Sequence, residues 1–274
     1  MLKRIGTGLD HPEGVAYSET HGLYCGGEAG QIYAVDLDTG GVRIVANTGG
    51  FLLGLAFGPG GKLFACDIGR SAVLRIDVET GEVEDISAGR GLQLVAPNYL
   101  AFARDGTLYF TDSGNWGDDD GRLLALPPSN GPAQVIAEGL AFANGIALGA
   151  TGDTLFVVES STPGVSEVSL SGSDRGKRSR IIEMPETVPD GIAVCRDGSL
   201  VIACYRPDTV YGWSSESGLS VIASDFTGLS LSAPTNVVFA GKTRDRLVTA
   251  NLAGYHLTEV IDAGRQGLWM EFTF

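Results

Sequence analysis

The chain has 274 residues, 43% of them hydrophobic, and 40 glycines and 11 prolines interrupt it. Its net charge of −14 and isoelectric point near 4.5 exclude the basic surfaces that nucleic acids and anionic membranes require. Residues 1–14 lack the apolar core of a signal peptide and no apolar run reaches membrane-spanning length, so we expect a cytoplasmic protein. The four cysteines lack metal-type spacing and are expected to be buried free thiols.

Residues 2–6 form a short apolar and basic segment that resembles the last strand of a repeat without the rest of it. The segment "LKRIG" parallels "VRIVA", which precedes the second copy of a repeated phrase. A ring of sheets with a free seam would expose strand edges. We therefore predict that residues 2–6 close the ring by joining the last repeat, after residues 255–261.

One phrase then recurs six times, and each copy opens with a leading residue, followed by any residue and a short apolar run. The leading residues are, in chain order, Glu13, Leu53, Asn98, Asn144, Asp190 and Thr235. Successive copies lie 40 to 46 residues apart. Each is followed by a turn and a second apolar run, such as "DGTLYFTD", and in most copies by two further strands.

This organisation predicts an all-β protein. No segment holds a 3.6-residue period, so helices should be nearly absent. Four short strands repeated every 40–50 residues are typical of a β-propeller blade. We expect a six-bladed β-propeller of four-stranded blades, closed by the N-terminal strand and formed as a single domain from residues 1–274.

Four of the six leading residues carry side-chain oxygens, and a propeller would bring them together at one end of its axis. Asn-Gly and Asp-Gly are also common turn dipeptides, so Asn144 and Asp190 taken singly indicate turns. Glu13 is a poor turn residue, however, and Asn98 is followed by tyrosine. Two carboxylates and two carboxamides converging on an axis require a cation, and an all-oxygen set favours calcium, magnesium or manganese over zinc.

The phrases "HPEG", "APNYLAF" with "LYFTDS", "FANGIAL", "PDGIAV" and "APTNVVFAG" resemble the gluconolactonase, regucalcin (senescence marker protein) and luciferin-regenerating-enzyme family across essentially the whole chain. The resemblance implies a six-bladed propeller in which Glu13, Asn144 and Asp190 hold a metal. It implies that Asn98 contacts the metal, its water or the substrate. It also implies that Asp190 serves as the general base.

Residues around the expected mouth of the site decide the substrate. Where sugar-lactone hydrolases of that family often place a substrate-binding arginine, this chain has Ala96. In the loops, Trp116 is expected to form an apolar wall, and Tyr205 with Arg206 to orient a polar substrate. His256 is a candidate proton shuttle at the mouth. The alternative is that His256 has a structural role. His11 is likewise either a participant in the site or a structural residue.

We therefore expect a divalent-metal-dependent lactonase acting on a sugar lactone or related cyclic ester. The metal would serve as Lewis acid, with Asp190 as general base and Asn98 as a second catalytic residue. The alternatives are a phosphotriesterase on the same metal site, or a non-catalytic calcium-binding or interaction propeller. The cofactor is expected to be one divalent cation, calcium first, with magnesium, manganese and zinc as alternatives. The expected partner is a small-molecule substrate, without nucleic acid or membrane, and the oligomeric state stays open.

Overall fold

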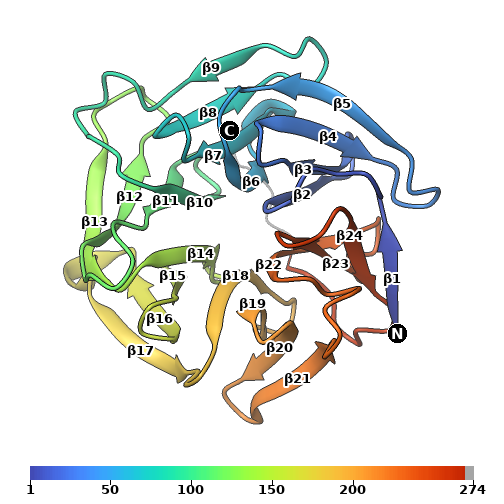
Figure 1. Ribbon diagram of the computed structural model, residues 1–274. Helices are drawn as coiled ribbons and strands as arrows, with labels where there is room; N and C mark the ends of the chain where they lie inside the picture. Colours follow the sequence, from blue (N-terminus) through green and yellow to red (C-terminus); the bar gives the residue numbers. More distant parts are fainter. Residues whose placement is uncertain (269–274) are drawn as a thin grey trace.

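The computed structural model describes residues 1–268, which form six four-stranded antiparallel sheets around a central axis (Figure 1). Each sheet is a blade whose strands follow chain order from the axis outward, except the sixth, whose outer strand comes from the N-terminus. The predicted all-β, six-bladed propeller is confirmed. The predicted domain of residues 1–274 also includes residues 269–274, which lie outside the described part.

The first three blades are built from residues 15–140. Blade 1 contains β2 (Val15–Ser18), β3 (Gly22–Gly26), β4 (Gln31–Val35) and β5 (Val42–Asn47). Blade 2 contains β6 (Leu52–Phe57), β7 (Leu63–Asp67), β8 (Ala72–Ile76) and β9 (Val83–Asp85). Blade 3 contains β10 (Pro97–Phe102), β11 (Leu108–Asp112), β12 (Gly121–Leu126) and β13 (Gln134–Leu140).

The last three blades follow in the same pattern. Blade 4 contains β14 (Ala143–Leu148), β15 (Thr154–Glu159), β16 (Gly164–Ser169) and β17 (Arg178–Glu183). Blade 5 contains β18 (Val188–Val194), β19 (Leu200–Arg206), β20 (Thr209–Ser214) and β21 (Gly218–Ser224). Blade 6 contains β22 (Pro234–Ala240), β23 (Arg246–Asn251), β24 (Leu257–Val260) and β1 (Leu2–Ile5).

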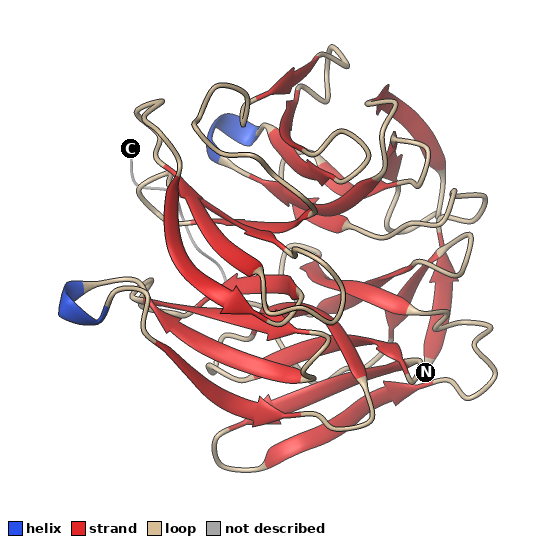
Figure 2. Ribbon diagram, turned by 60° about the vertical axis from the view of Figure 1, so that its left-hand side comes forward, coloured by secondary structure: helices blue, strands red, loops and turns tan. Residues whose placement is uncertain are grey.

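Helix is confined to two short 3-10 turns in the described residues, η1 (Pro59–Gly61) and η2 (Gly172–Asp174), seen in Figure 2. The expectation that helices are nearly absent is confirmed. Within residues 1–268 no helix is long and apolar enough to cross a membrane. All four cysteines are free and buried, as expected.

The ring is closed by β1, as predicted. It runs antiparallel to β24, with Leu2 opposite Val260 and Ile5 opposite Leu257. Ile5 is buried in this position. In Figure 1 the N-terminal strand lies on the outer edge of the sheet that contains the last strands of the chain. Each blade therefore has four strands, and the seam lies within blade 6.

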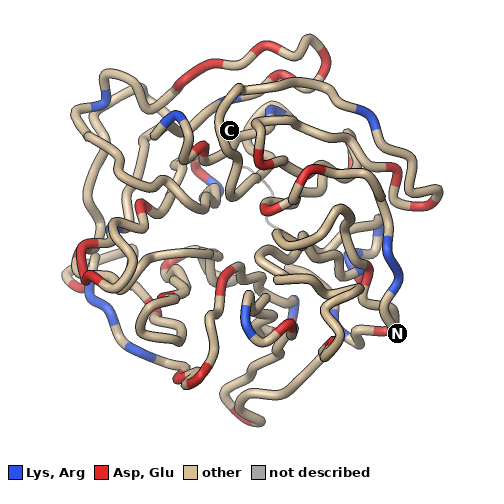
Figure 3. The backbone as a smooth tube through the Cα atoms, in the orientation of Figure 1, with Lys and Arg blue, Asp and Glu red and all other residues tan. Residues whose placement is uncertain are grey.

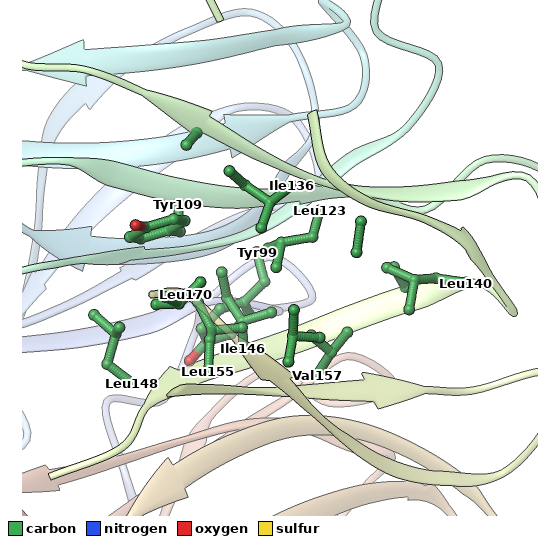
Figure 4. Close-up of a cluster of buried hydrophobic side chains, with 14 residues drawn as sticks. Tyr99, Tyr109, Leu123, Ile136, Leu140, Ile146, Leu148, Leu155, Val157 and Leu170 are labelled. Carbon is green, nitrogen blue, oxygen red and sulfur yellow. The ribbon is translucent and has the colours of Figure 1, made fainter. Parts of the chain in front are cut away.

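The hydrophobic core lies between neighbouring blades, because alternate side chains of each strand point to opposite faces of its sheet. Figure 4 shows one such layer, in which Tyr99 and Leu123 of blade 3 pack against Ile146 and Leu155 of blade 4. Burying one aliphatic side chain of this size contributes roughly 1.5–3 kcal/mol. Interblade packing thus fixes each inner strand, and every leading residue on it, relative to the axis.

A β-bulge marks the leading residue in blades 2 to 6, where the pairing between first and second strands shifts register. In blade 4, Ala143 pairs with Glu159 and Ile146 with Val157, so Asn144 and Gly145 together face a single residue of β15. Bulges of this kind re-aim side chains and are common beside active sites.

The glycine after the leading residue permits close approach of neighbouring inner strands. A Cβ atom on Gly145 would lie 2.4 Å from the carbonyl oxygen of Asp190, and one on Gly191 would lie 2.5 Å from that of Thr235. Both glycines lie inside strands, β14 and β18. The alternative that Asn144–Gly145 and Asp190–Gly191 form hairpin turns is therefore wrong.

Candidate metal centre

Four polar leading residues are buried at the start of the inner strands. Asn98, Asn144 and Asp190 lie at the bulges of β10, β14 and β18, and Glu13 lies just before β2. Their exposed fractions are only 3–7%. Figure 3 shows acidic positions around the rim of the ring and also beside its central opening. Six acidic residues are buried among the described residues, and two of them, Glu13 and Asp190, are leading residues at the axis.

A serine orients each carboxamide. The Nδ2 of Asn98 donates to Ser113 Oγ at 3.0 Å, and that hydroxyl donates to the carbonyl oxygen of Ala143 at 2.6 Å. Blade 4 repeats the arrangement, because Asn144 Nδ2 donates to Ser160 Oγ at 3.2 Å and the hydroxyl donates to a main-chain carbonyl of blade 5. Each serine hydroxyl binds an amide nitrogen, so the amide oxygen of the same side chain remains available to bind another group.

The oxygens left over have no hydrogen-bond donor among the described residues. They are the Oδ1 atoms of Asn98, Asn144 and Asp190, together with that of Asn236. A buried polar oxygen without a partner costs about 1–3 kcal/mol. Four such atoms on neighbouring inner strands indicate a binding site for a cation, which oxygen ligands stabilise.

The carboxyls of Glu13 and Asp190 also indicate that a cation binds between them. Burial raises the pKa of Glu13 well above its ordinary value, and the nearby charge of Asp190 raises it further. Burial likewise raises the pKa of Asp190, and a hydrogen bond from Asn144 offsets only part of that rise. Two buried carboxylates are stable together only if a proton or a cation lies between them. Oxygen donors of mixed charge fit a hard divalent cation such as calcium.

The sequence reasoning missed Asn236 and did not predict that Ser113 and Ser160 orient the carboxamides. Asn236 Nδ2 donates to Glu13 Oε2 at 3.4 Å, yet the repeat assigns only its neighbour Thr235 to the axis. The sequence feature that could have identified Asn236 is that it stands where four of the six phrases have glycine. Ser113 and Ser160 each directly follow the acidic residue that ends the second strand, in "TDS" and "VES", and that shared pattern is their signal.

Residues 11–251 match the protein family described as the SMP-30/Gluconolactonase/LRE-like region. The chain belongs to this family. It is 29% identical over 219 residues to protein strictosidine synthase-like 6 of Arabidopsis thaliana, a match covering 73% of this chain and 58% of that protein. The chain spans 40–58% of the length of the first curated relatives that it matches.

Solved structures of the same shape include a gluconolactonase from Xanthomonas campestris, 23% identical, with a TM-score of 0.80 over 94% of this chain and 88% of that one. Another is a calcium-binding protein, regucalcin, from Agrobacterium tumefaciens, 15% identical, with a TM-score of 0.76 over 98% of this chain and 96% of that one. At these identities the likeness establishes the fold.

Ala96 lies two residues before Asn98 in the third phrase, at the position where the family resemblance suggested an arginine. Ala96 is buried and its backbone N–H donates to Asp112 Oδ1 at 2.6 Å. Asp112 in turn pairs with Arg122. Position 96 therefore presents a methyl group instead of a guanidinium, and the nearest strand carboxylate is already neutralised.

Trp116 lies in the loop between β11 and β12, at the end of the ring where the leading residues begin their strands. It is 60% exposed, and its ring lies 4.9 Å from that of Phe142 in an edge-on arrangement. Phe142 is two residues before Asn144. The exposed Trp116 and the half-buried Phe142 thus form an aromatic pair near one of the axial asparagines, and the role of Trp116 as an apolar wall stays a prediction.

Tyr205 and Arg206 lie at the end of β19 and interact with each other. The Arg206 guanidinium lies 4.7 Å from the centre of the Tyr205 ring. It also donates to the Tyr205 carbonyl oxygen at 2.8 Å and to Asp208 at 2.9 Å. The positive charge of Arg206 is therefore already paired in this conformation.

The two candidate histidines have local partners. His256 is buried, its Nε2 lies 3.0 Å from the carbonyl oxygen of Ser230, and burial lowers its pKa. This contact ties two loops together, which favours the structural alternative. His11 lies at the rim, with Nδ1 at 3.1 Å from Asp10 Oδ1 and 3.2 Å from Glu28 Oε2.

Proposed function

We propose that the protein is a divalent-metal-dependent hydrolase of lactones or related cyclic esters. The observation that carries the proposal is the group of buried oxygens of Asn98, Asn144 and Asp190, which have no partner in residues 1–268, beside the buried carboxyl of Glu13. Membership of the SMP-30/Gluconolactonase/LRE-like family supports it. So does the likeness of fold to a gluconolactonase and to a calcium-binding regucalcin.

In this proposal Glu13, Asn144 and Asp190 hold the cation, and Asn98 lies beside it. When bound, the cation supplies Lewis-acid polarisation of the substrate carbonyl and stabilises negative charge on its oxygen. Calcium is the first choice because the donor set is all oxygen and carries two carboxylates. A neighbouring cation also lowers the pKa of a carboxyl, so both acids are ionised in the loaded protein.

Asp190 is proposed as the general base because a carboxylate has two oxygens, so that one can bind the cation while the other accepts a proton. It takes the proton of the attacking water as the water oxygen bonds to the carbonyl carbon. When the ring C–O bond breaks, the same proton passes to the leaving alkoxide, giving the hydroxy acid. The free Oδ1 of Asn98 accepts a hydrogen bond from the water or from a substrate hydroxyl.

The mouth favours a cyclic ester with few hydroxyl groups. Ala96 offers no polar atom from its side chain, and the exposed ring of Trp116 with Phe142 offers an apolar surface beside Asn144. The Arg206 charge is paired with Asp208. We therefore propose alkyl- or aryl-substituted lactones ahead of polyhydroxylated sugar lactones.

The test is turnover of a lactone panel by metal-stripped protein, followed by addition of calcium, magnesium, manganese or zinc in turn. Acid release measured by pH-stat should be absent without metal and restored by one of these ions. Turnover of phosphotriesters but of no lactone would favour the phosphotriesterase. Tight metal binding without turnover of lactones, esters or phosphotriesters would leave a non-catalytic calcium-binding propeller.

A further inference from the structure

Asn236 lies on the inner strand of blade 6, between the two strands that carry the acidic residues of the axis. Blade 6 adjoins blade 5, which carries Asp190, and the ring closes it against blade 1, which follows Glu13. Asn236 is fully buried, at 0% exposure. Its Nδ2 reaches Glu13 Oε2 at 3.4 Å, and a methyl group built on Gly191 would come within 3.1 Å of its Oδ1. The side chain therefore spans from one acidic strand to the other.

At position 236 the contact between neighbouring blades does not require a glycine. In blades 4 and 5 the corresponding residues, Gly145 and Gly191, press against a carbonyl of the next blade. In blade 6 the link to blade 1 is instead a hydrogen bond, because Thr235 Oγ1 donates to the Glu13 carbonyl oxygen at 2.8 Å. Interblade contact is thus kept without a glycine.

The amide of Asn236 is only half satisfied by the protein. Its nitrogen has the Glu13 carboxyl as acceptor, but its Oδ1 is buried and has no donor among the described residues. Packing alone would be served by an apolar residue or glycine at this position. An asparagine with a free oxygen beside two carboxyls indicates a ligand.

We propose that Asn236 Oδ1 is a further ligand of the cation, while its Nδ2 holds the carboxylate of Glu13 in place. This inference rests on the metal site of the proposed function. Five of the six blades would then supply one oxygen-bearing side chain each, namely Glu13, Asn98, Asn144, Asp190 and Asn236. Four protein ligands with two charges, namely Glu13, Asn144, Asp190 and Asn236, with Asn98 beside the cation, favour calcium over magnesium, which keeps several waters and uses one or two carboxylates. Blade 2, with Leu53, supplies none and leaves coordination for water or substrate.

The experiment is terbium luminescence, because Tb³⁺ replaces calcium at oxygen sites and its lifetimes in H₂O and D₂O count bound waters. Asn236→Gly installs the residue that four other phrases carry, so packing should tolerate it. We expect one additional bound water and a loss of Tb³⁺ and Ca²⁺ affinity of roughly 10–100-fold. Asn236→Asp keeps the oxygen and should retain the wild-type water number.

Thr249→Val is the matched control. Thr249 is a buried blade 6 residue on β23, and its hydroxyl also has no partner in the described part of the chain. It should bind Tb³⁺ as the wild type does. In metal-free protein, Asn236→Gly should keep most of its melting temperature but gain less from added calcium. An unchanged water number and affinity in folded Asn236→Gly would overturn the inference and leave the metal site standing. Absence of Tb³⁺ and Ca²⁺ binding in the wild type would overturn both.

Discussion

Asn98 and Asp190 are equivalent positions of the third and fifth repeats, but their chemistry differs. Each is buried at the bulge of an inner strand and has a free Oδ1. Asn98 is neutral and its nitrogen is held by Ser113. Asp190 carries a charge and can accept a proton. Binding and chemistry can therefore be separated by changing one residue of each kind.

At saturating metal, Asp190→Asn should be the more damaging substitution in kcat. It keeps the shape and one ligand oxygen but removes the base, whose loss typically costs a factor of about 10²–10⁴ in rate. Asn98→Ala removes a neutral oxygen and should act mainly by raising KM. Steady-state kinetics on the best lactone of the panel measure both. A near-normal kcat in metal-loaded Asp190→Asn would remove this residue as base.

At the scale of the strand and its repeat, the sequence predicted the blades but not the detail of their inner edges. The strand order followed from the repeated phrases, because the period of turns and apolar runs is local. The bulge at Asn144 and the need for Gly145 depend on how closely blade 5 approaches, which involves residues about 45 positions away. The free amide oxygens depend on Ser113 and Ser160, which lie 15 and 16 positions after the asparagines that they bind.

Gly191→Ala tests this close approach. The added Cβ would lie 2.5 Å from the Thr235 carbonyl oxygen, so blades 5 and 6 must move apart. Overpacking of this kind costs about 1–3 kcal/mol, and the shift of Asp190 should also weaken calcium binding. Gly41→Ala is the control, since a Cβ there meets no atom closer than 3.4 Å. Equal urea midpoints for the two variants would show that the inner strands can separate without cost.

At the scale of the whole molecule, closure of the ring joins the two ends of the propeller within blade 6. The strand β1 covers the edge of β24, and Ile5 and Leu9 are buried beside it. Deleting residues 1–8 should lower the melting temperature markedly, because it exposes a sheet edge and removes buried Ile5. Removing Met1 alone is the control. An unchanged melting temperature in the eight-residue deletion would mean that β1 contributes little to closure.

The cation should stabilise the whole ring, because its proposed ligands come from separate blades and only the folded chain brings them together. A ligand bound only by the native state adds about 2.7 kcal/mol when its free concentration is 100 times its Kd. Chelation should therefore lower the melting temperature, and calcium should restore it. The rise in melting temperature on adding calcium should be larger at pH 8 than at pH 5, since protons compete with the cation for Glu13 and Asp190. Glu216→Gln, at an exposed carboxylate in the turn between β20 and β21, should respond to chelation as the wild type does. Calorimetry that finds the same melting temperature with chelator and with excess calcium would contradict a cation shared between blades.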